Sequence, residues 1–151
     1  RALAAAITLC MLPGIIAAPT FGVFASAESD SAAATEYTEA ATFSEKVQKL
    51  RDLGQKDIIL DPGYGFAKTT DHNYELLQHQ EMLKVFGLPI LVGLSRKSMV
   101  YKLLGTAPED ALNGTSVLNT IALQKGANIL RVHDVKACAE VVKIVRKTSY
   151  F

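Results

Sequence analysis

Short apolar runs recur along the second half of the chain, and each run ends in polar, chargeable residues. The runs and their polar continuations are IIL (58–60) with DPGYGFAK (61–68), ILVG (90–93) with SRKS (95–98), and IL (129–130) with RVHD (131–134). Because the runs are continuously apolar, they predict strands buried on both faces, as in a parallel sheet covered by helices. Ligands bind at the carboxyl ends of such strands. The polar residues therefore predict a site for an anionic, hydrogen-bonding small molecule.

Helical patterns separate the apolar runs. Residues expected to cap these helices are Thr42, Asp71, Thr106 and Asp134. A short helix is expected to run from Ser95 to Leu104, because Ser95 follows the second run and favours a helix start. The chain should thus form adjacent parallel strands with helices on one face and right-handed connections. The strands are expected at residues 57–61, 89–94 and 128–132.

The first 35 residues differ in composition from the rest of the chain. Residues 2–27 are almost uncharged and rich in alanine, and they end in ASA before an acidic stretch. A basic start, an apolar stretch and an A-x-A tripeptide are typical of a secretory signal peptide. Prolines within the stretch argue against a transmembrane helix, which needs about 20 apolar residues; non-native sequence is an equal alternative. We expect residues 1–35 to lie outside the fold and residues 36–151 to form one α/β domain.

Composition and charge narrow the class of protein. The chain has 151 residues, of which 49% are hydrophobic and 21% charged, as expected for a single globular domain. Its net charge of +1 gives no indication of a nucleic-acid partner or of attraction to a membrane surface. Cys10 and Cys138 lie far apart, and no Cys/His metal spacing is present. A disulfide framework and a zinc site are therefore not expected.

Each polar segment has a ligand-binding interpretation and a structural alternative. Residues 61–68 alternate glycine with aromatic residues and could form a flat wall for a planar ligand, or could simply form a turn. Residues 95–98 could hold a carboxylate or phosphate at a helix start, or could be a serine cap with a solvated basic pair. Arg131 and His133 are two residues apart at a strand end, so both should point to the same side. The alternative there is an ion pair and an exposed histidine.

Taken together, DPGYGFAK, GLSRKS and RVHD, in this order and spacing, resemble dihydropteroate synthase, and LNGT at residues 112–115 also fits that family. The resemblance covers about residues 37–146. It implies a TIM barrel of which this chain supplies strands six to eight with their helices. It also implies an enzyme of folate biosynthesis, the target of sulfonamides. This transferase condenses 6-hydroxymethyl-7,8-dihydropterin pyrophosphate with 4-aminobenzoate and releases pyrophosphate.

The resemblance implies a role for each candidate residue, and no catalytic nucleophile. The pterin would be bound by Asp61, Gly93 and Lys97, 4-aminobenzoate by Phe66, Lys97 and Ser98, and pyrophosphate by Arg131 and His133. This sequence departs from the family's pattern at two positions. Tyr64 stands where phenylalanine is expected, and Ala67 stands where glycine is common, which should need only a little more room.

The resemblance also implies Mg²⁺, a homodimer and a cytoplasmic location, although the signal-like residues 1–27 conflict with that location. The ligand for Mg²⁺ is expected in an N-terminal part that this chain lacks, so we expect the chain alone to be an inactive fragment. A pterin-binding methyltransferase-type domain and a non-catalytic fragment are the alternatives. The SRKS and RVHD segments favour the synthase, because pyrophosphate needs cations and a methyl group does not.

Overall fold

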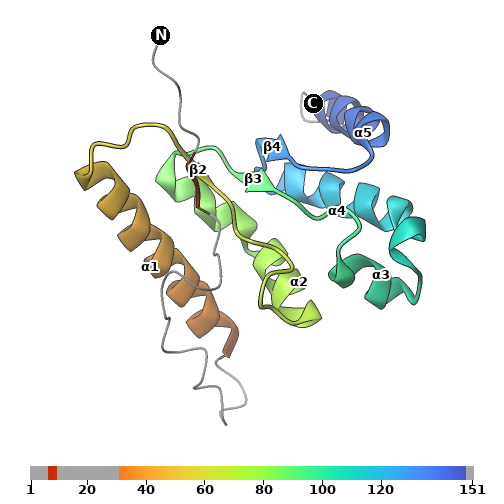
Figure 1. Cartoon of the computed structure of the whole chain (residues 1–151), viewed down its shortest axis with the longest axis horizontal. Helices are drawn as coiled ribbons and strands as arrows, with labels where there is room; N and C mark the ends of the chain where they lie inside the picture. The colour runs from red at the N-terminus through yellow and green to blue at the C-terminus, as the bar shows by residue number, and fades with distance from the viewer. Residues whose placement is uncertain (1–6, 10–30, 149–151) are drawn as a thin grey trace.

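The computed structural model describes the backbone of residues 7–9 and 31–148, and the side chains of residues 42–148. Strands alternate with helices along this part of the chain (Figure 1), which confirms the predicted α/β class. The elements, with η marking 3-10 helices, are β1 (Ile7–Leu9), α1 (Ser31–Asp52), β2 (Ile58–Leu60), α2 (Thr70–Gln78), η1 (Gln80–Phe86), β3 (Leu91–Val92), α3 (Ser98–Leu104), η2 (Pro108–Asp110), α4 (Leu112–Gln124), β4 (Ile129–Leu130) and α5 (Val135–Thr148). None of the described helices is long and apolar enough to cross a membrane.

The described strands pair in parallel. β3 pairs with β4, with Leu91 opposite Ile129, and a parallel bridge joins Leu60 of β2 to Ile90 just before β3. The Leu60 amide donates to the Pro89 carbonyl at 2.9 Å, which continues this contact. β2, β3 and β4 are therefore neighbours in that order, as predicted, although each strand is shorter than predicted.

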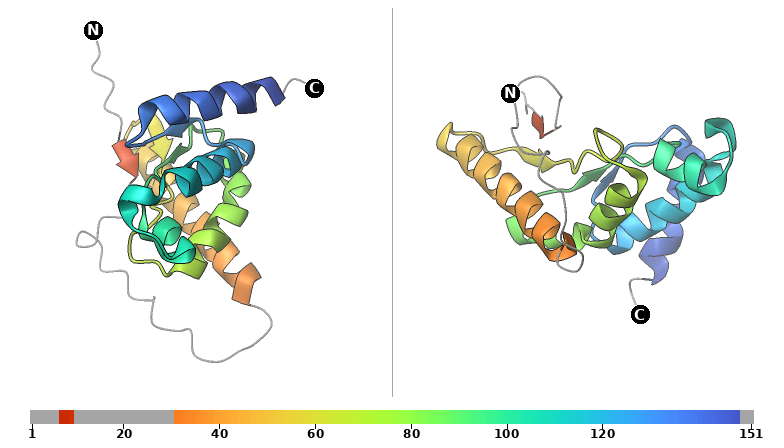
Figure 2. Two further views of the ribbon diagram at one scale, coloured as in Figure 1. Left: turned by 90° about the vertical axis from the view of Figure 1, so that its right-hand side faces the viewer. Right: turned by 90° about the horizontal axis from the view of Figure 1, so that it is seen from below.

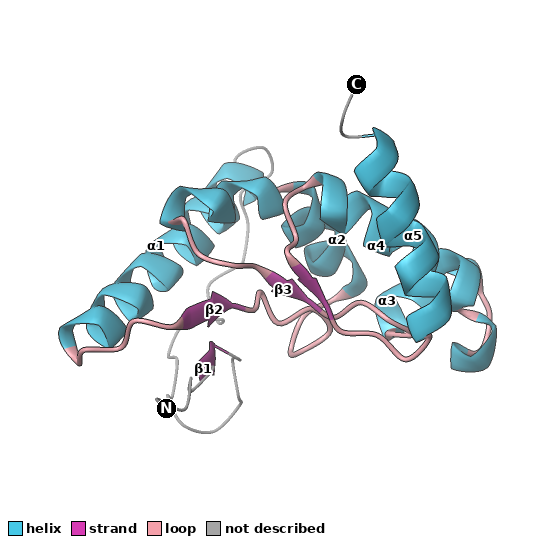
Figure 3. Ribbon diagram, turned by 90° about the horizontal axis from the view of Figure 1, so that it is seen from above, coloured by secondary structure: helices cyan, strands magenta, loops and turns pink. Residues whose placement is uncertain are grey.

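The helices lie along one side of the row of strands, with α1 at one end and α3, α4 and α5 at the other (Figures 2 and 3). Leu60 and Val92 are fully buried, because their side chains face this layer of helices. Ile129 of β4 is 37% exposed, and Ile59 between two buried residues of β2 is only half-buried. The expectation that the strands are buried on both faces is therefore wrong for the described residues.

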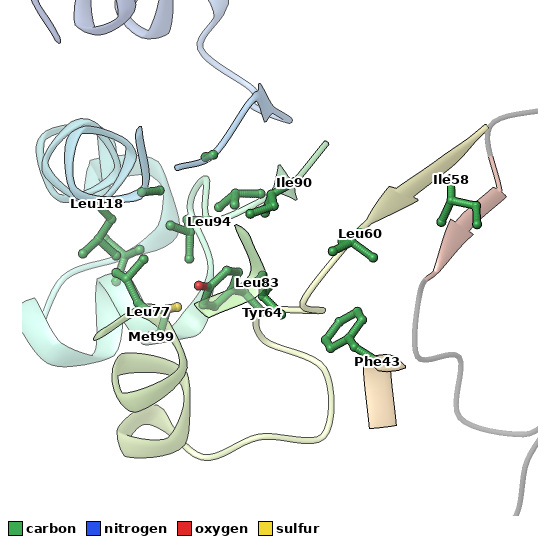
Figure 4. Packing of buried hydrophobic residues seen from close by; sticks show 14 of the residues in the cluster. Phe43, Ile58, Leu60, Tyr64, Leu77, Leu83, Ile90, Leu94, Met99 and Leu118 are labelled. Carbon is green, nitrogen blue, oxygen red and sulfur yellow. The ribbon is translucent and has the colours of Figure 1, made fainter. Parts of the chain in front are cut away.

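The hydrophobic core fills the layer between the strands and the helices (Figure 4). It extends from Phe43 on α1, past the strands, to Leu118 on α4. Tyr64, Leu94 and Met99 lie between these ends, and each is at most 1% exposed. Two of them, Tyr64 and Leu94, belong to the loops that follow β2 and β3. The same core that joins strands to helices therefore also anchors the loops at the carboxyl ends of the strands.

The N-terminal boundary of the fold differs from the prediction. α1 begins at Ser31, so Thr42 lies inside this helix and does not cap it. The alanine-rich residues before Thr42 have high helix propensity and continue the helix backward. β1 pairs in parallel with β2, with Ile7 opposite Ile58. Parts of residues 1–35 thus belong to the fold, contrary to expectation, whereas most of the signal-like segment lies outside the described residues.

The starts of two further helices also differ from the prediction. The Thr69 side chain, and not Asp71, caps α2, since its oxygen accepts a hydrogen bond from the His72 amide at 3.2 Å. Asp71 occupies the first turn of that helix, where a negative charge is also favourable. α3 begins at Ser98, three residues after the expected Ser95, and it ends at Leu104 as predicted. The residues before Ser98 thus form a loop, in which Ser95 and Arg96 contact the loop after β4 and Lys97 contacts the loop after β2.

Candidate functional site

The carboxyl ends of β2, β3 and β4 lead into loops whose polar side chains meet at one edge of the sheet. Two of these loops line a cavity of about 140 Å³, and the lining residues are Gly93, Ser95, Lys97, Arg131, Val132 and His133. Sites for small molecules usually enclose about 300–1,000 Å³, so this cavity has room for only part of such a ligand. Of the predicted site residues, Asp61, Phe66 and Ser98 lie outside the lining.

Asp61 immediately follows β2 and is almost completely buried, with 2% of its surface exposed. Its Oδ1 atom accepts a hydrogen bond from the Gly63 amide at 2.9 Å. Its Oδ2 atom is buried and has no hydrogen-bond partner among the described residues. A buried carboxylate oxygen without a donor costs free energy, so this oxygen offers a ready acceptor to a ligand that carries N–H groups.

Arg131 follows β4 and reaches across β3 toward Asp61. Its Nη2 atom lies 3.8 Å from Asp61 Oδ2, a distance that allows charge attraction but no hydrogen bond. A Cβ atom added at Gly93 would come within 3.1 Å of Arg131 Nε and Nη2. The absence of a side chain at Gly93 therefore leaves room for the Arg131 guanidinium.

The loop after β2 depends on its glycines. Gly63 and Gly65 have φ angles of 71° and 79°, a left-handed conformation that glycine adopts without steric cost. The Gly65 amide donates to Asn73 Oδ1 at 2.6 Å. Lys68 Nζ donates back to the carbonyls of Pro62 and Gly63, at 3.3 and 3.4 Å. Lys68 therefore stabilises the loop after β2.

Lys97 and Phe66 come from different loops and meet at the edge of the site. Lys97 Nζ lies 4.7 Å from the centre of the Phe66 ring, within the range of a cation–π interaction. The same amine donates a hydrogen bond to the carbonyl of Tyr64. Phe66 is 39% exposed, so one face of this pair is open to a ligand. Ser98 is half-buried at the first position of α3.

His133 and Arg131 line the same cavity, and so does Val132 between them, because β4 ends at Leu130 and the alternation of a strand does not continue here. The His133 amide donates to Ser95 Oγ at 3.2 Å, and His133 Nδ1 lies 2.9 Å from the same oxygen. Ser95 was expected to cap a helix and instead orients this histidine. The structural alternative, a solvated basic pair after Ser95, is not observed, since Arg96 and Lys97 both have hydrogen-bond partners. Arg96 pairs with Asp134, whose carboxylate was expected to cap α5.

The pair of Arg96 and Asp134 is bidentate. Arg96 Nε and Nη2 donate to the two carboxylate oxygens of Asp134 at 2.9 and 2.8 Å. These hydrogen bonds lower the pKa of the Asp134 carboxyl and raise the pKa of the Arg96 guanidinium. Both groups therefore stay charged through the neutral range.

Sequence reasoning missed two buried amides that support the loop after β2. Tyr64 donates its hydroxyl hydrogen to Gln80 Oε1 at 3.0 Å, and Gln80 Nε2 donates to the Ala122 carbonyl at 2.9 Å. Asn73 accepts from Gly65 and donates to the Thr69 carbonyl at 2.6 Å. Polar residues on otherwise amphipathic helices carry no local signal of such long-range partners, so these contacts emerge only from the structure.

No group of three or more His, Cys, Asp or Glu side chains within residues 42–148 could hold a metal ion. The chemistry available at this edge comes from a buried carboxylate, from Lys97 and Arg131, and from the exposed His133. Such a set can bind an anion at one end and a hydrogen-bond donor at the other.

Comparison with known proteins connects this geometry to a family. Residues 24–133 match the family described as pterin binding enzyme. The chain is 42% identical over 108 residues to the dihydropteroate synthase of Escherichia coli, an alignment that covers 70% of this chain and 38% of that enzyme. The chain therefore spans well under half the length of the curated relatives it matches. The resemblance inferred from the motifs is confirmed.

Solved structures give the same result. A dihydropteroate synthase from Coxiella burnetii in complex with pteroic acid matches with a TM-score of 0.75 and 34% identity, over 80% of this chain and 46% of that one. A Yersinia pestis dihydropteroate synthase in a sulfonamide drug complex matches with a TM-score of 0.73 and 38% identity, over 83% and 45% of the two chains.

Proposed function

This chain belongs to the family of pterin binding enzymes, and we propose that it is part of a dihydropteroate synthase. The complete enzyme would condense 6-hydroxymethyl-7,8-dihydropterin pyrophosphate with 4-aminobenzoate and release pyrophosphate. The observation that carries this proposal is the buried Oδ2 atom of Asp61, which has no hydrogen-bond donor among the described residues and lies beside the Arg131 guanidinium. One edge of the sheet thus offers an acceptor for a pterin and a cation for pyrophosphate.

The pterin would lie against Asp61, with Gly93 and Lys97 beside it. A buried carboxylate accepts hydrogen bonds from the amino group and the ring nitrogen of a pterin, and these bonds are charge-assisted. Arg131 already lies between Asp61 and Gly93, so a bound pterin would share that space with its guanidinium. The planar guanidinium suits this arrangement, because it can stack on an aromatic ring.

Pyrophosphate would be held by Arg131 and His133, which line one cavity. The amino nitrogen of 4-aminobenzoate forms a bond to the methylene carbon of the pterin, while the bond from that carbon to the pyrophosphate oxygen breaks. The nitrogen then loses one proton to solvent, and pyrophosphate leaves with the electron pair of the broken bond. Cations placed where the leaving anion gains charge lower the barrier to this step. Phe66, Lys97 and Ser98 would hold 4-aminobenzoate, whose ring fits the exposed face of Phe66 and whose carboxylate suits Ser98.

Further parts of the proposal follow from the family. β2, β3 and β4 would correspond to strands six, seven and eight of a TIM barrel, and the ligand for Mg²⁺ would lie elsewhere in the complete enzyme. The enzyme would form a homodimer and act in the cytoplasm. The residues of this chain that bind substrates would all lie in the domain at 36–151. Sulfonamides would compete with 4-aminobenzoate, since a drug of this class occurs in the complex with the Yersinia pestis relative.

The proposal is tested with a completed protein, defined as the N-terminal part of the Escherichia coli relative followed by residues 37–151 of this chain. Pyrophosphate release from the two substrates is measured with the Escherichia coli enzyme in parallel. We expect release by the completed protein, competition by a sulfonamide, and no release by the 151-residue chain alone. Circular dichroism establishes that the completed protein is folded.

A folded completed protein that binds neither pterin nor pyrophosphate would refute the proposal. Binding of the pterin without any binding of pyrophosphate would instead favour a methyltransferase-type domain, because that reaction needs no site for pyrophosphate. Calorimetric titration with each compound alone separates these outcomes. Activity of the 151-residue chain alone would contradict the expectation that it is an inactive fragment.

A further inference from the structure

The loops after β3 and β4 are joined by side chains that extend beyond the pairing of their strands. β3 and β4 pair over only two residues each. Ser95 then binds the backbone and the ring of His133, and Arg96 binds both oxygens of Asp134. Consecutive residues of one loop thus contact consecutive residues of the other. We refer to Ser95, Arg96, His133 and Asp134 as the loop clamp.

Arg96 is held too firmly to serve as a ligand-binding cation. Its Nη1 atom donates to the carbonyls of Pro108 and Glu109 at 3.2 and 2.8 Å, and its amide donates to Thr115 Oγ1 at 3.1 Å. Its guanidinium therefore joins Asp134 to the η2 segment, and Arg96 does not line the cavity. These contacts fix the residue between three parts of the fold.

The backbone of Arg96 supports the same conclusion. Its φ angle is 53°, in the left-handed region that residues with a side chain rarely adopt. Such a conformation is unfavourable by itself and persists only where the surroundings determine it. Ser95 and Lys97, the residues on either side of Arg96, both line the cavity, whereas Arg96 itself does not.

We propose that Arg96 is a positioning residue of the reaction, which acts through Asp134 and the loop clamp to hold Arg131 and His133 at a fixed distance from Lys97. The inference rests on the proposed function, because that function assigns Lys97 to one end of the reaction and Arg131 and His133 to the other. Lys97 directly follows Arg96, and His133 directly precedes Asp134, so the clamp controls both sides of the cavity. A misplacement of about 1 Å in such a site can reduce the rate about a hundredfold.

The test uses Arg96→Lys and Asp134→Asn in the completed protein, singly and together. Lysine keeps the positive charge but cannot form the planar two-bond pair with a carboxylate. We expect each single variant to lower kcat about tenfold or more, as for a small misplacement of the reacting groups, with little change in KM for 4-aminobenzoate. The double variant should be no worse than either single one, because both remove the same contact. Inorganic pyrophosphate should bind more weakly to all three.

Lys125→Gln is the matched control. Lys125 forms an ion pair with Glu81 at 3.2 Å, and neither residue lines the cavity, so removing it should leave kcat unchanged. Amide hydrogen exchange gives a second measurement that does not depend on activity. The His133 amide donates to Ser95 Oγ, so its exchange should accelerate in the clamp variants and not in the control.

The outcomes separate the two proposals. A completed protein without substitutions that binds pyrophosphate but catalyses no reaction refutes the proposed function, and the exchange and pyrophosphate measurements still decide the clamp. Clamp variants with unchanged kcat, pyrophosphate affinity and His133 exchange overturn the inference while leaving the function intact. Faster exchange throughout the protein, with equal losses in the control, would show general destabilisation and would also overturn it.

Discussion

Substitution of Asp61 by asparagine tests the pterin end of the site most directly. The carboxylate is 2% exposed, and its Oδ1 atom is already used by the Gly63 amide. The asparagine would keep an oxygen for Gly63 and turn its NH₂ group toward the position of Oδ2. A ligand that donates hydrogen bonds at that position would then face a donor in place of an acceptor. Asp61→Asn should therefore weaken pterin binding.

The size of the effect follows from the single oxygen involved. Loss of one charge-assisted hydrogen bond costs about 1.5–3 kcal/mol, which corresponds to about a ten- to a hundredfold loss of affinity. The substitution also removes the charge attraction to Arg131, but that side chain is 53% exposed, so the attraction contributes little to stability. The protein should therefore remain folded while pterin affinity falls.

Calorimetric titration of the completed protein with 6-hydroxymethyl-7,8-dihydropterin alone, and with pyrophosphate alone, measures the effect. Asp57→Asn is the control, because it removes the same charge at an exposed position just before β2. Pterin affinity should fall in Asp61→Asn only, and pyrophosphate affinity should not fall. If Asp61→Asn left pterin binding intact while Arg131→Ala abolished it, the assignment of the two ends of the site would be wrong.

Further expectations follow from single contacts. Arg131→Ala should weaken pyrophosphate binding about ten- to a hundredfold, measured by titration; unchanged affinity would contradict its role. Gly114→Ala should lower the free energy of unfolding in urea, since its Cβ would lie 2.6 Å from the Val100 side chain and 2.8 Å from the Leu104 side chain of α3. A higher free energy of unfolding would show that these side chains can move aside without cost. Tyr64→Phe should cost about 1–3 kcal/mol by leaving Gln80 Oε1 without its donor, and adding Gln80→Leu should recover part of the loss. The hydrogen bonds from Arg96 lower the pKa of the Asp134 carboxyl below its ordinary value of 3.8, so their contribution to stability is present above pH 3.8 and is lost as the pH falls further. The difference in melting temperature between the unsubstituted protein and Asp134→Asn should therefore narrow below that pH.

The parallel strands and the meeting of their polar ends could be predicted because the signals are local. A continuous apolar run indicates a buried strand, and parallel pairing brings the carboxyl ends together. The side-chain alternation of a strand predicts Arg131 and His133 on one side; both line the cavity, but so does Val132 between them, because β4 ends at Leu130. The parallel pairing of the strands, and not the alternation within them, brings these polar residues to one edge of the sheet.

The backbone conformations within the loops could not be predicted in the same way. Ala67 was expected to need only more room than glycine, yet its φ angle is 50°, in the left-handed region where glycine is favoured. The departure from the family's glycine is therefore a matter of backbone conformation and not of space. The start of α1 was missed for a different reason, because a capping pattern at Thr42 was outweighed by the helix propensity of the residues before it.

The SRKS segment shows why adjacent residues need not share a ligand. Arg96 points to Asp134 and the η2 carbonyls, whereas Lys97 points to Tyr64 and the Phe66 ring. The left-handed backbone at Arg96 accompanies this divergence of neighbouring side chains. Arg96 and Asp134 are 38 positions apart in the sequence, so no local pattern could pair them. The motif therefore combines one residue that faces the site with another that holds the loops around it, and its two basic residues should respond differently to substitution.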